Sequence, residues 1–570
     1  MNAISHFNAS APMLQAYPDS IGEGLHEAVQ LLHAQELRGL FDTFYILPSV
    51  FNSDVDRGFS IINYDLNAMT ASEQDLKALK DSGIALKLDF VLNHLSVLSP
   101  QFQDVLRNGS SSRYKNFFIN WNTFWESYGE RSPDGIIIPR EECLRPMFFR
   151  KPGLPILKAC LPDGQEIPYW NTFYHKVYCD AIDPLQLMDE LGTQYSQAQA
   201  ISDAIRAAQD GEGGLEQLVL GKLEYMRPAI LAYLKRHRRY LGQLDLNLTD
   251  PLVWEFYEDT LCRLAGYGAD IVRLDALGYA AKRPGARNFM TEPDTWLLLR
   301  RLKKEADALG LTLLPEIHAS YGERTHERVC EEGCITYDFF FPGLLLDALE
   351  NQSFAYLMQW IQDIQNKGLQ VVNMLGCHDG IPLLDLEGLL PDSRIQTLVE
   401  ILRSRGGLTT DFHGAKNVTY YQVCSTYFSA LGGTERRLLF ARALQMFMPG
   451  KPQVWYLDLF AGTNDVEAVR RAGPSGLRDI NRTNLSIEDA TARLQSSVVQ
   501  KQLRLLRFRT SCPAFGPGSQ FEARWPSEHT LVLIWQAGDF RIQLEADAAD
   551  CSFRIVQTEP NGVQRVVMAQ

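Results

Sequence analysis

The stretch Ile271–Asp275 reads IVRLD, a short apolar run that ends in a carboxylate. Three further stretches share this pattern: DFVLNH at Asp89–His94, LPEIH at Leu314–His318 and NMLGCHD at Asn373–Asp379. A buried parallel strand looks like this when its C-terminal tip carries chemistry. We therefore expect four strands that point several carboxylates into one pocket.

Apolar runs and amphipathic segments alternate on both sides of these stretches. Amphipathic segments such as Glu73–Ser82 and Thr295–Leu309 predict helices. Eight strands that alternate with helices favour an α/β fold, a (β/α)8 TIM barrel with right-handed crossovers. The eight predicted strands are Met13–Tyr17, Phe44–Pro48, Ala85–Leu92, Asp270–Leu274, Thr312–Ile317, Ile335–Phe341, Gln370–Leu375 and Pro452–Leu457.

Two gaps in the alternation are too long for simple links between a strand and a helix. Long excursions from a barrel usually rise above its catalytic face and build the substrate pocket. The expected division is barrel strands 1–3 in residues 1–96, an inserted domain in 97–248, barrel strands 4–7 in 249–379, an inserted loop domain in 380–445, barrel strand 8 and closing helices in 446–507, and a small C-terminal antiparallel β domain in 508–570.

The first excursion contains a helical insertion at about 174–243. Its sequence predicts two helices, Tyr195–Asp210 and Leu215–Tyr240, joined by a glycine-rich link. Arg227-Pro228 is expected to kink the second helix, because proline breaks the helical hydrogen-bond ladder. Three roles stay open for this insertion: a lid, an oligomer contact or an inert decoration.

Composition excludes several classes of protein. The chain has 570 residues, of which 45% are hydrophobic and 22% charged, and its net charge is −14. That acidic balance argues against nucleic acid as a partner. Neither a membrane span nor a signal peptide is expected. The ten cysteines form no CxxC pair, which indicates reduced thiols in a cytoplasmic protein. A monomer or a homodimer is expected, without a sequence feature that decides between them.

One cysteine spacing resembles a metal site. His326, Cys330 and Cys334 lie four residues apart and would share a helix face. Gly333 interrupts that run, and the sequence offers no nearby fourth ligand. We therefore expect ordinary helix packing there and no metal.

The acids at the strand tips suit chemistry on a glycosidic bond. Asp275 follows Arg273 by two places, so both side chains share a strand face and the guanidinium can keep the carboxylate ionised. That environment suits a nucleophile. Glu316 lies among apolar neighbours that resist its ionisation, which suits a general acid. If these two groups lie about 5 Å apart, the reaction retains configuration.

The third acid, Asp379, directly follows His378. A carboxylate beside a histidine can hold two sugar hydroxyls and favour a distorted, positively charged ring. Each motif alone is weak evidence for this function, but the four motifs in this order indicate a sugar-processing barrel.

These stretches resemble the α-amylase family of glycoside hydrolases and transferases, glycoside hydrolase family 13. The similarity narrows to its sucrose phosphorylase subgroup and covers the chain from about Leu14 to Arg509. It rests on DRGF at Asp56–Phe59, GADIVRLDALGYAAK at Gly268–Lys282, LLPEIHASY at Leu313–Tyr321, HDGIPLLDLEGLLP at His378–Pro391, YYQVCSTYFSALG at Tyr420–Gly432, PGKPQVWYLDLFAGTND at Pro449–Asp465 and RDINR at Arg478–Arg482.

The resemblance implies a role for each matching residue. Asp275 would be the nucleophile, Glu316 the acid/base and Asp379 the transition-state stabiliser. The residues that would hold the glucosyl ring are Asp56, His94, Arg273, His378 and Arg478, with Phe59 and Phe173 as its apolar platform. Those that would border the acceptor and phosphate site are Tyr279, His318, Tyr421, Gln422 and Lys151.

The resemblance further implies a glucosyl-transferring enzyme that needs no cofactor. Such an enzyme cleaves an α-glucoside with phosphate and yields α-glucose 1-phosphate with retained configuration. Its partners would be small molecules. A hydrolase or transglucosidase on the same fold is the second reading, and an inactive binding protein is the third.

Two departures from the subgroup's pattern affect the acceptor. Lys151 stands where an arginine usually helps to bind fructose and phosphate, and Thr419 stands where an aspartate usually contacts fructose. Sucrose is the first expectation for the substrate. Glucosylglycerol follows, and then sucrose 6-phosphate or glucosylglycerate. Arg150 beside Lys151 either binds a phosphorylated acceptor or is an ordinary loop cation, and the second reading is preferred.

Overall fold

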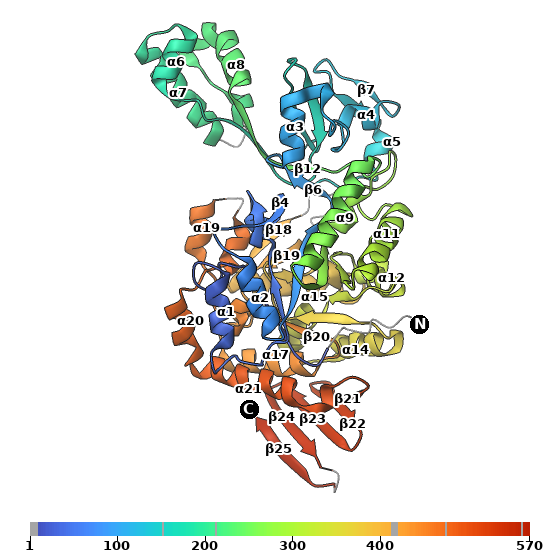
Figure 1. Ribbon diagram of the computed structural model, residues 1–570. Helices are drawn as coiled ribbons and strands as arrows, with labels where there is room; N and C mark the ends of the chain where they lie inside the picture. Colours follow the sequence, from blue (N-terminus) through green and yellow to red (C-terminus); the bar gives the residue numbers. More distant parts are fainter. Residues whose placement is uncertain (1–8, 151–152, 211–213, 412–419, 474–475, 560–561) are drawn as a thin grey trace.

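The computed structural model describes residues 9–150, 153–210, 214–411, 420–473, 476–559 and 562–570. Its centre is a barrel of parallel strands surrounded by helices (Figure 1). A lobe with helices α6, α7 and α8 projects from one end, and the C-terminal strands β21–β25 lie at the other.

Eight parallel strands form the barrel, and seven of the eight neighbouring pairs are joined by regular strand pairing. An Ile335 N–H donates to the Leu313 carbonyl at 3.3 Å and links β14 to the start of β15. The predicted (β/α)8 barrel is therefore confirmed, with all eight expected strands. They are β1 (Met13–Ala16), β2 (Thr43–Ile46), β5 (Ala85–Val91), β13 (Ala269–Asp275), β14 (Thr312–Pro315), β15 (Thr336–Asp338), β16 (Val371–Met374) and β20 (Lys451–Trp455).

The helices around the barrel begin at recognisable caps. Before α2, the Ser72 side chain accepts from the Asp75 N–H, and the Asp75 side chain accepts from the Ser72 N–H, a capping box. Asp250 caps α9 just ahead of a proline in the first turn. Helices packed around the strands include α1 (Leu25–His33), α2 (Glu73–Asp81), α9 (Pro251–Gly266), α11 (Asp294–Ala308), α13 (Phe341–Asn351), α14 (Ala355–Lys367), α17 (Glu435–Phe447) and α21 (Ser497–Ser511).

The first excursion forms a small subdomain on the barrel. Trp121, Trp125 and Trp170 are almost fully buried and form the centre of its own apolar cluster. The ring centroids of Trp121 and Trp170 lie 4.8 Å apart. Its elements include β6 (His94–Ser96), α3 (Pro100–Asn108), α4 (Trp121–Trp125), β7 (Gly129–Arg131), β8 (Ile137–Pro139), α5 (Glu141–Leu144), β9 (Ile156–Cys160) and β10 (Glu166–Trp170).

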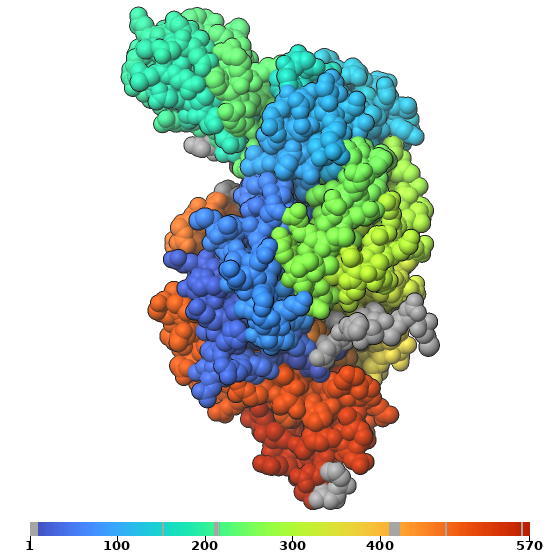
Figure 2. Space-filling view, in the orientation of Figure 1, coloured from blue at the N-terminus to red at the C-terminus, as the bar shows by residue number. Residues whose placement is uncertain are grey.

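The helical lobe is carried by an antiparallel pair, β11 (His175–Cys179) and β12 (Arg238–Asp245). Its helices α6 (Pro184–Leu191), α7 (Tyr195–Asp210) and α8 (Arg227–Arg236) enclose a separate apolar cluster. Figure 2 shows the lobe standing away from the barrel. A core of its own indicates that the lobe is a folded unit on a two-stranded stalk.

The predicted helix Tyr195–Asp210 matches α7, but the predicted helix Leu215–Tyr240 is wrong. The chain passes through short 3-10 turns before α8, and it enters β12 at Arg238. Pro228 lies in the first turn of α8, so it does not kink a longer helix. The first turn accepts proline because its N–H has no intrahelical partner there.

The second excursion contributes an antiparallel sheet beside the barrel mouth. Its elements include β17 (Ile381–Pro382), α15 (Asp392–Ser404), β18 (Leu408–Asp411) and β19 (Tyr420–Cys424). The C-terminal sheet, confirmed as antiparallel, has the order β21 (Gln520–Ser527), β22 (Thr530–Ala537), β23 (Phe540–Asp547), β24 (Ser552–Thr558) and β25 (Gln564–Ala569). Trp535 of β22 donates to the Phe447 carbonyl at 2.8 Å and ties this sheet to α17. Among the described residues, no helix is both long and apolar enough to cross a membrane.

Candidate active site

A polar cavity of about 240 Å³ opens at the C-terminal ends of the barrel strands. Segments far apart in the chain form its wall, including the strand tips after β5, β13, β14 and β16. Ten of the residues singled out from the sequence line it: Asp56, Phe59, His94, Phe173, Asp275, Tyr279, Glu316, His378, Asp379 and Arg478.

Arg273 lies beneath this cavity and connects the two acids of interest. Its side chain is 2% exposed. One nitrogen, Nη1, lies 2.9 Å from Asp275 Oδ1, and Nη2 lies 2.7 Å from Glu316 Oε1. Nη1 also pairs with the buried carboxylate of Asp89. A single guanidinium therefore holds both candidate catalytic acids on one side of the cavity.

The protonation of the two acids follows from their neighbours. Burial raises the pKa of Asp275 well above its usual value, and the charges of Glu316 and Asp89 add to that rise against the opposing pull of Arg273. Burial also acts to raise the pKa of Glu316, but Arg273 and His318 outweigh it and lower that pKa to about 2. The sequence suggested apolar neighbours for Glu316, but they are not all apolar, because Arg273 and His318 face its carboxylate.

Asp379 lies in a cluster of positive groups. Its Oδ1 is 3.1 Å from Arg478 Nη1 and 3.5 Å from Arg482 Nη2, and its Oδ2 is 3.3 Å from His378 Nε2. Burial acts to raise the pKa of Asp379, but Arg478 and the other cations lower it far below its usual value. Burial, together with the charges of the neighbouring arginines, lowers the pKa of His378 to about 3 against the opposing effect of Asp379. The pair is therefore an ionised carboxylate beside a neutral imidazole.

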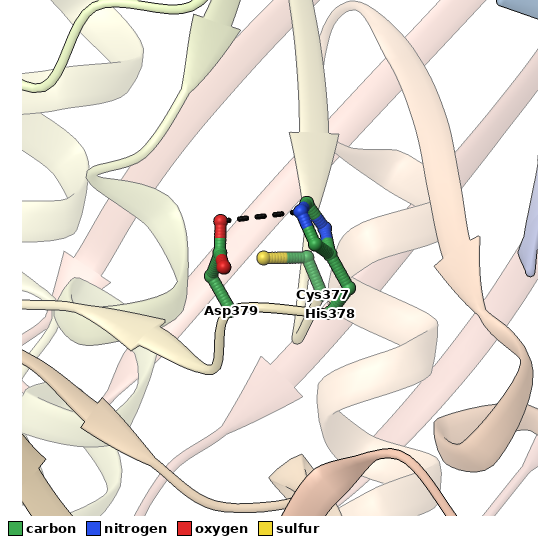
Figure 3. A group of neighbouring side chains, drawn as sticks. All are labelled: Cys377, His378 and Asp379. Carbon is green, nitrogen blue, oxygen red and sulfur yellow. Dashed lines mark ion pairs between the residues drawn. The ribbon is translucent and has the colours of Figure 1, made fainter. Parts of the chain in front are cut away.

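Cys377, His378 and Asp379 are the one set of neighbouring donor atoms within metal-binding reach among the described residues (Figure 3). Protein contacts already occupy those atoms. The Cys377 thiol donates to the Gly380 carbonyl at 3.6 Å, and His378 Nδ1 lies 3.1 Å from the Gln15 amide. The geometry is that of a hydrogen-bond cluster. His326, by contrast, packs between aromatic rings, with its ring centroid 5.0 Å from that of Phe340.

Aromatic rings form the apolar part of the cavity. Phe59 stacks on His378 with centroids 5.1 Å apart and an interplanar angle of 14°. The His94 Nε2 lies 2.9 Å from the Phe59 carbonyl, and its ring contacts Phe173 at 4.9 Å. Phe173 in turn meets Tyr279 edge-on at 5.3 Å. These rings give a sugar an apolar face opposite the charged groups.

The DRGF turn at the rim depends on its glycine. Gly58 has φ +111°, and a Cβ there would lie 2.1 Å from the Ser49 nitrogen. Asp56 and Arg57 also have positive φ, at 53° and 47°. Non-glycine residues in this conformation carry strain, which is commonly stored at ligand sites. The turn brings Asp56 within 3.8 Å of Arg478 at the cavity edge.

Three predicted residues lie beside the cavity instead of lining it. Arg273, His318 and Gln422 line a small adjoining pocket that shares Glu316, His378 and Asp379 with the cavity. Lys151 lies outside the described residues, as does Thr419. Tyr421 belongs to β19, but its side chain is outside the described part.

Arg150, Gln243, Ala276 and Arg482 are additional members of this site. The first three line the cavity, and Arg482 supports it from below. Arg150 Nη1 donates to the Tyr279 hydroxyl at 3.0 Å, and its guanidinium lies 5.2 Å from the Phe173 ring centroid. The sequence favoured the interpretation of Arg150 as an ordinary loop cation, but its side chain lines the cavity. Arg482 ends the RDINR motif, but no sequence signal marks Gln243.

The proteins that resemble this chain include the following three. One, named sucrose 6(F)-phosphate phosphorylase, from Ilumatobacter coccineus, is 47% identical over 551 residues that cover 95% of each chain. A crystal structure of sucrose 6F-phosphate phosphorylase from Thermoanaerobacter thermosaccharolyticum matches with a TM-score of 0.80 at 29% identity, over 99% of each chain. The α-amylase from H. orenii shares the fold, with a TM-score of 0.56 at 13% identity over 95% of this chain and 90% of that one.

A scan against protein-family models matched none. The similarity to the Ilumatobacter protein nevertheless spans nearly the whole of both chains, and the barrel, the cavity and the shared fold agree with it. The chain therefore belongs to the α-amylase family, glycoside hydrolase family 13, and within it to the sucrose phosphorylase group of α-glucoside phosphorylases.

Proposed function

We propose that this enzyme cleaves sucrose that carries a phosphate on C6 of its fructosyl unit. Inorganic phosphate would be the attacking group, and the products would be α-glucose 1-phosphate and fructose 6-phosphate. This proposal replaces unphosphorylated sucrose, the first expectation from the sequence, as the preferred substrate. The relative from Ilumatobacter coccineus supports the change through its name.

The position of Arg150 carries the argument for a phosphorylated acceptor. Its guanidinium lies on the cavity wall beside two of the aromatic rings, Phe173 and Tyr279. A guanidinium presents several N–H donors in a fixed fork that fits a phosphate group. A neutral acceptor such as glycerol carries no negative charge for this guanidinium to bind.

Cleavage of the glucosyl bond would begin with Asp275 and Glu316. Asp275 attacks the anomeric carbon while Glu316 protonates the leaving oxygen of the fructosyl unit. The product is a glucosyl ester of Asp275. In the reactive form the proton is on Glu316 and the charge is on Asp275, the reverse of what the two pKa values favour. Arg273 contacts both carboxylates and can stabilise either charge.

The remaining polar groups would stabilise the positive charge that develops on the sugar ring in the transition state of each step. Asp379 stays ionised at neutral pH because its cationic neighbours hold its pKa low. Ionised Asp379 and neutral His378 can each bind a ring hydroxyl. In the second step, an oxygen of phosphate bonds to the anomeric carbon and the bond to Asp275 breaks, with its electron pair returning to the carboxylate. The phosphate O–H proton passes to Glu316, which resets the enzyme.

A substrate comparison tests this proposal directly. The purified protein is incubated with sucrose, with the 6-phosphate on its fructosyl unit, with glucosylglycerol and with glucosylglycerate, each with and without inorganic phosphate. We expect α-glucose 1-phosphate from the phosphorylated sucrose at a kcat/KM at least tenfold above the others. A preference for an unphosphorylated substrate would overturn the acceptor assignment. Equal glucose release with and without phosphate would indicate a hydrolase.

A further inference from the structure

His318 and Asp385 form a charged pair next to the candidate acid/base. His318 Nδ1 lies 3.1 Å from Asp385 Oδ2, and Nε2 lies 3.7 Å from Glu316 Oε1. The imidazole also stacks on Phe339, with ring centroids 4.0 Å apart. Asp385 belongs to a 3-10 turn, Leu384–Leu386, in the loop after β16, and it is 2% exposed. A distant loop therefore fixes the orientation of this imidazole.

We propose that Asp385 is a positioning residue that keeps His318 protonated and aimed at the acceptor side of Glu316, where the imidazolium binds the attacking inorganic phosphate. This inference rests on the proposed phosphorolysis. Neither residue forms a bond to the glucosyl unit. Asp385 acts through His318, and it decides how well phosphate competes with water for the glucosyl ester.

The direction of attack places the phosphate near His318. In a double displacement the second nucleophile approaches from the side that the leaving group vacated, and the group that protonated the leaving oxygen accepts its proton. That group is Glu316. A phosphate positioned to hand its proton to Glu316 would lie close to any cation beside that carboxylate. Arg273 and His318 are both cations beside it. Arg273 is already shared among Asp89, Asp275 and Glu316. The phosphate is therefore assigned to His318, which lines the small pocket that adjoins the cavity and shares Glu316 with it. Water has no comparable need for a cation.

The pocket around His318 explains why its charge persists. Burial alone would lower the pKa of His318, but Asp385 and Glu316 outweigh burial and raise it to about 10. Without Asp385, burial would weigh more heavily, and the imidazolium would be lost at a lower pH. The other titratable residues that line this pocket are Arg273, Tyr337, Cys377, His378 and Asp379.

The test compares phosphorolysis and hydrolysis in Asp385→Asn, because both reactions consume the same glucosyl ester. We expect the KM for inorganic phosphate to rise about tenfold or more at pH 8, while hydrolysis without phosphate changes by less than about threefold. The phosphate-dependent rate should decline at a lower pH than in the unaltered enzyme. Asp385→Glu should restore part of the phosphate affinity, which loss of packing alone would not allow.

Asp338→Asn is the matched control, since Asp338 is another buried acid at a neighbouring strand end and bonds to Trp360 at 2.9 Å outside the cavity. It should leave the KM for phosphate unchanged. An Asp385→Asn enzyme with an unaltered KM for phosphate would overturn the inference. So would a change confined to the KM for the phosphorylated sucrose, because that result would place His318 at the acceptor's phosphate. If the unaltered enzyme shows no phosphate-dependent cleavage, the proposed function itself fails.

Discussion

Arg273 Nη1 lies 2.9 Å from Asp275 Oδ1, and the two residues are separated by one position on the same barrel strand. Alternation along a strand places both side chains on one face, so this ion pair is built into the motif IVRLD. The same guanidinium reaches Glu316 on the next strand. Neighbouring parallel strands thus bring the two acids together at one end of the barrel.

The two acids should differ in how they respond to the leaving group. Asp275→Asn removes the proposed nucleophile and should lower kcat/KM at least ~10³-fold with every substrate. Glu316→Gln should be as damaging with a natural glucoside but much less so with α-glucosyl fluoride, because fluoride leaves without a proton. Initial rates with both substrates measure this. Asp270→Asn, at the opposite end of β13, is the control, and a Glu316→Gln enzyme equally slow with the fluoride would remove Glu316 from the acid role.

Arg150 should govern discrimination between phosphorylated and unphosphorylated substrates. A lost charge-assisted hydrogen bond costs about 1.5–3 kcal/mol, and each 1.4 kcal/mol is about tenfold in affinity. Arg150→Ala should therefore lower kcat/KM for the phosphorylated sucrose about 10- to 100-fold and alter that for sucrose only slightly. Arg145→Ala, an exposed arginine in the same subdomain, serves as the reference. An equal loss with both substrates would contradict a role in phosphate recognition.

Asp338 should make the protein less stable as the pH rises. Burial raises its pKa to about 7, and its Oδ2 has no hydrogen-bond partner. In the unfolded chain the carboxyl ionises near pH 4. The unfolded state therefore loses this proton first, and stability falls between about pH 4 and 7 before levelling off.

Replacement of this carboxyl should remove that penalty. Asp338→Asn keeps an oxygen acceptor for Trp360 and the Phe341 N–H but cannot ionise. We expect it to stabilise the protein at pH 8 by on the order of 2 kcal/mol, with a smaller effect near pH 5. Urea unfolding at both pH values measures the difference. An effect of equal size at both pH values would argue against ionisation as the cause.

The helical lobe should be dispensable for the barrel. Cys179 and Arg238 are paired residues at the lobe end of β11 and β12. A two-residue Asn-Gly turn can close an antiparallel pair there. Deletion of 180–237 with this turn should leave the thermal midpoint within a few degrees and the kcat/KM for the natural substrate within about threefold. Calorimetry and initial rates test both.

A substitution in the core of the lobe gives a second variant to compare with this deletion. Ile201→Asp should unfold the lobe by placing a charge at a fully buried position while the stalk stays intact. Similar activity in both variants is expected, because Phe173 and Gln243, which line the cavity, lie at the base of the stalk. A large loss of activity in both would instead identify the lobe as a lid.

The sequence by itself determined the barrel and the three acids at its mouth. Strand periodicity and the position of each acid after an apolar run are local properties, and parallel strands with regular crossovers allow one main arrangement. Asp275, Glu316 and Asp379 were predicted on those grounds, and the structure brings them to one cavity. The predicted helix Leu215–Tyr240 failed because the stalk strand β12 uses its last residues, a pairing that depends on a segment about sixty positions away.

Only the tertiary structure decided the protonation of the acidic and histidine side chains and the position of Arg150 in the site. The protonation of Glu316 depends on Arg273 from the next strand and on His318, whose own charge depends on Asp385 from a later loop. Arg150 lines the cavity next to Tyr279, whose hydroxyl accepts its hydrogen bond from a position far along the chain. Coulomb interactions act through space over a few ångströms, so residues far apart in the chain set them, and no local pattern records that proximity.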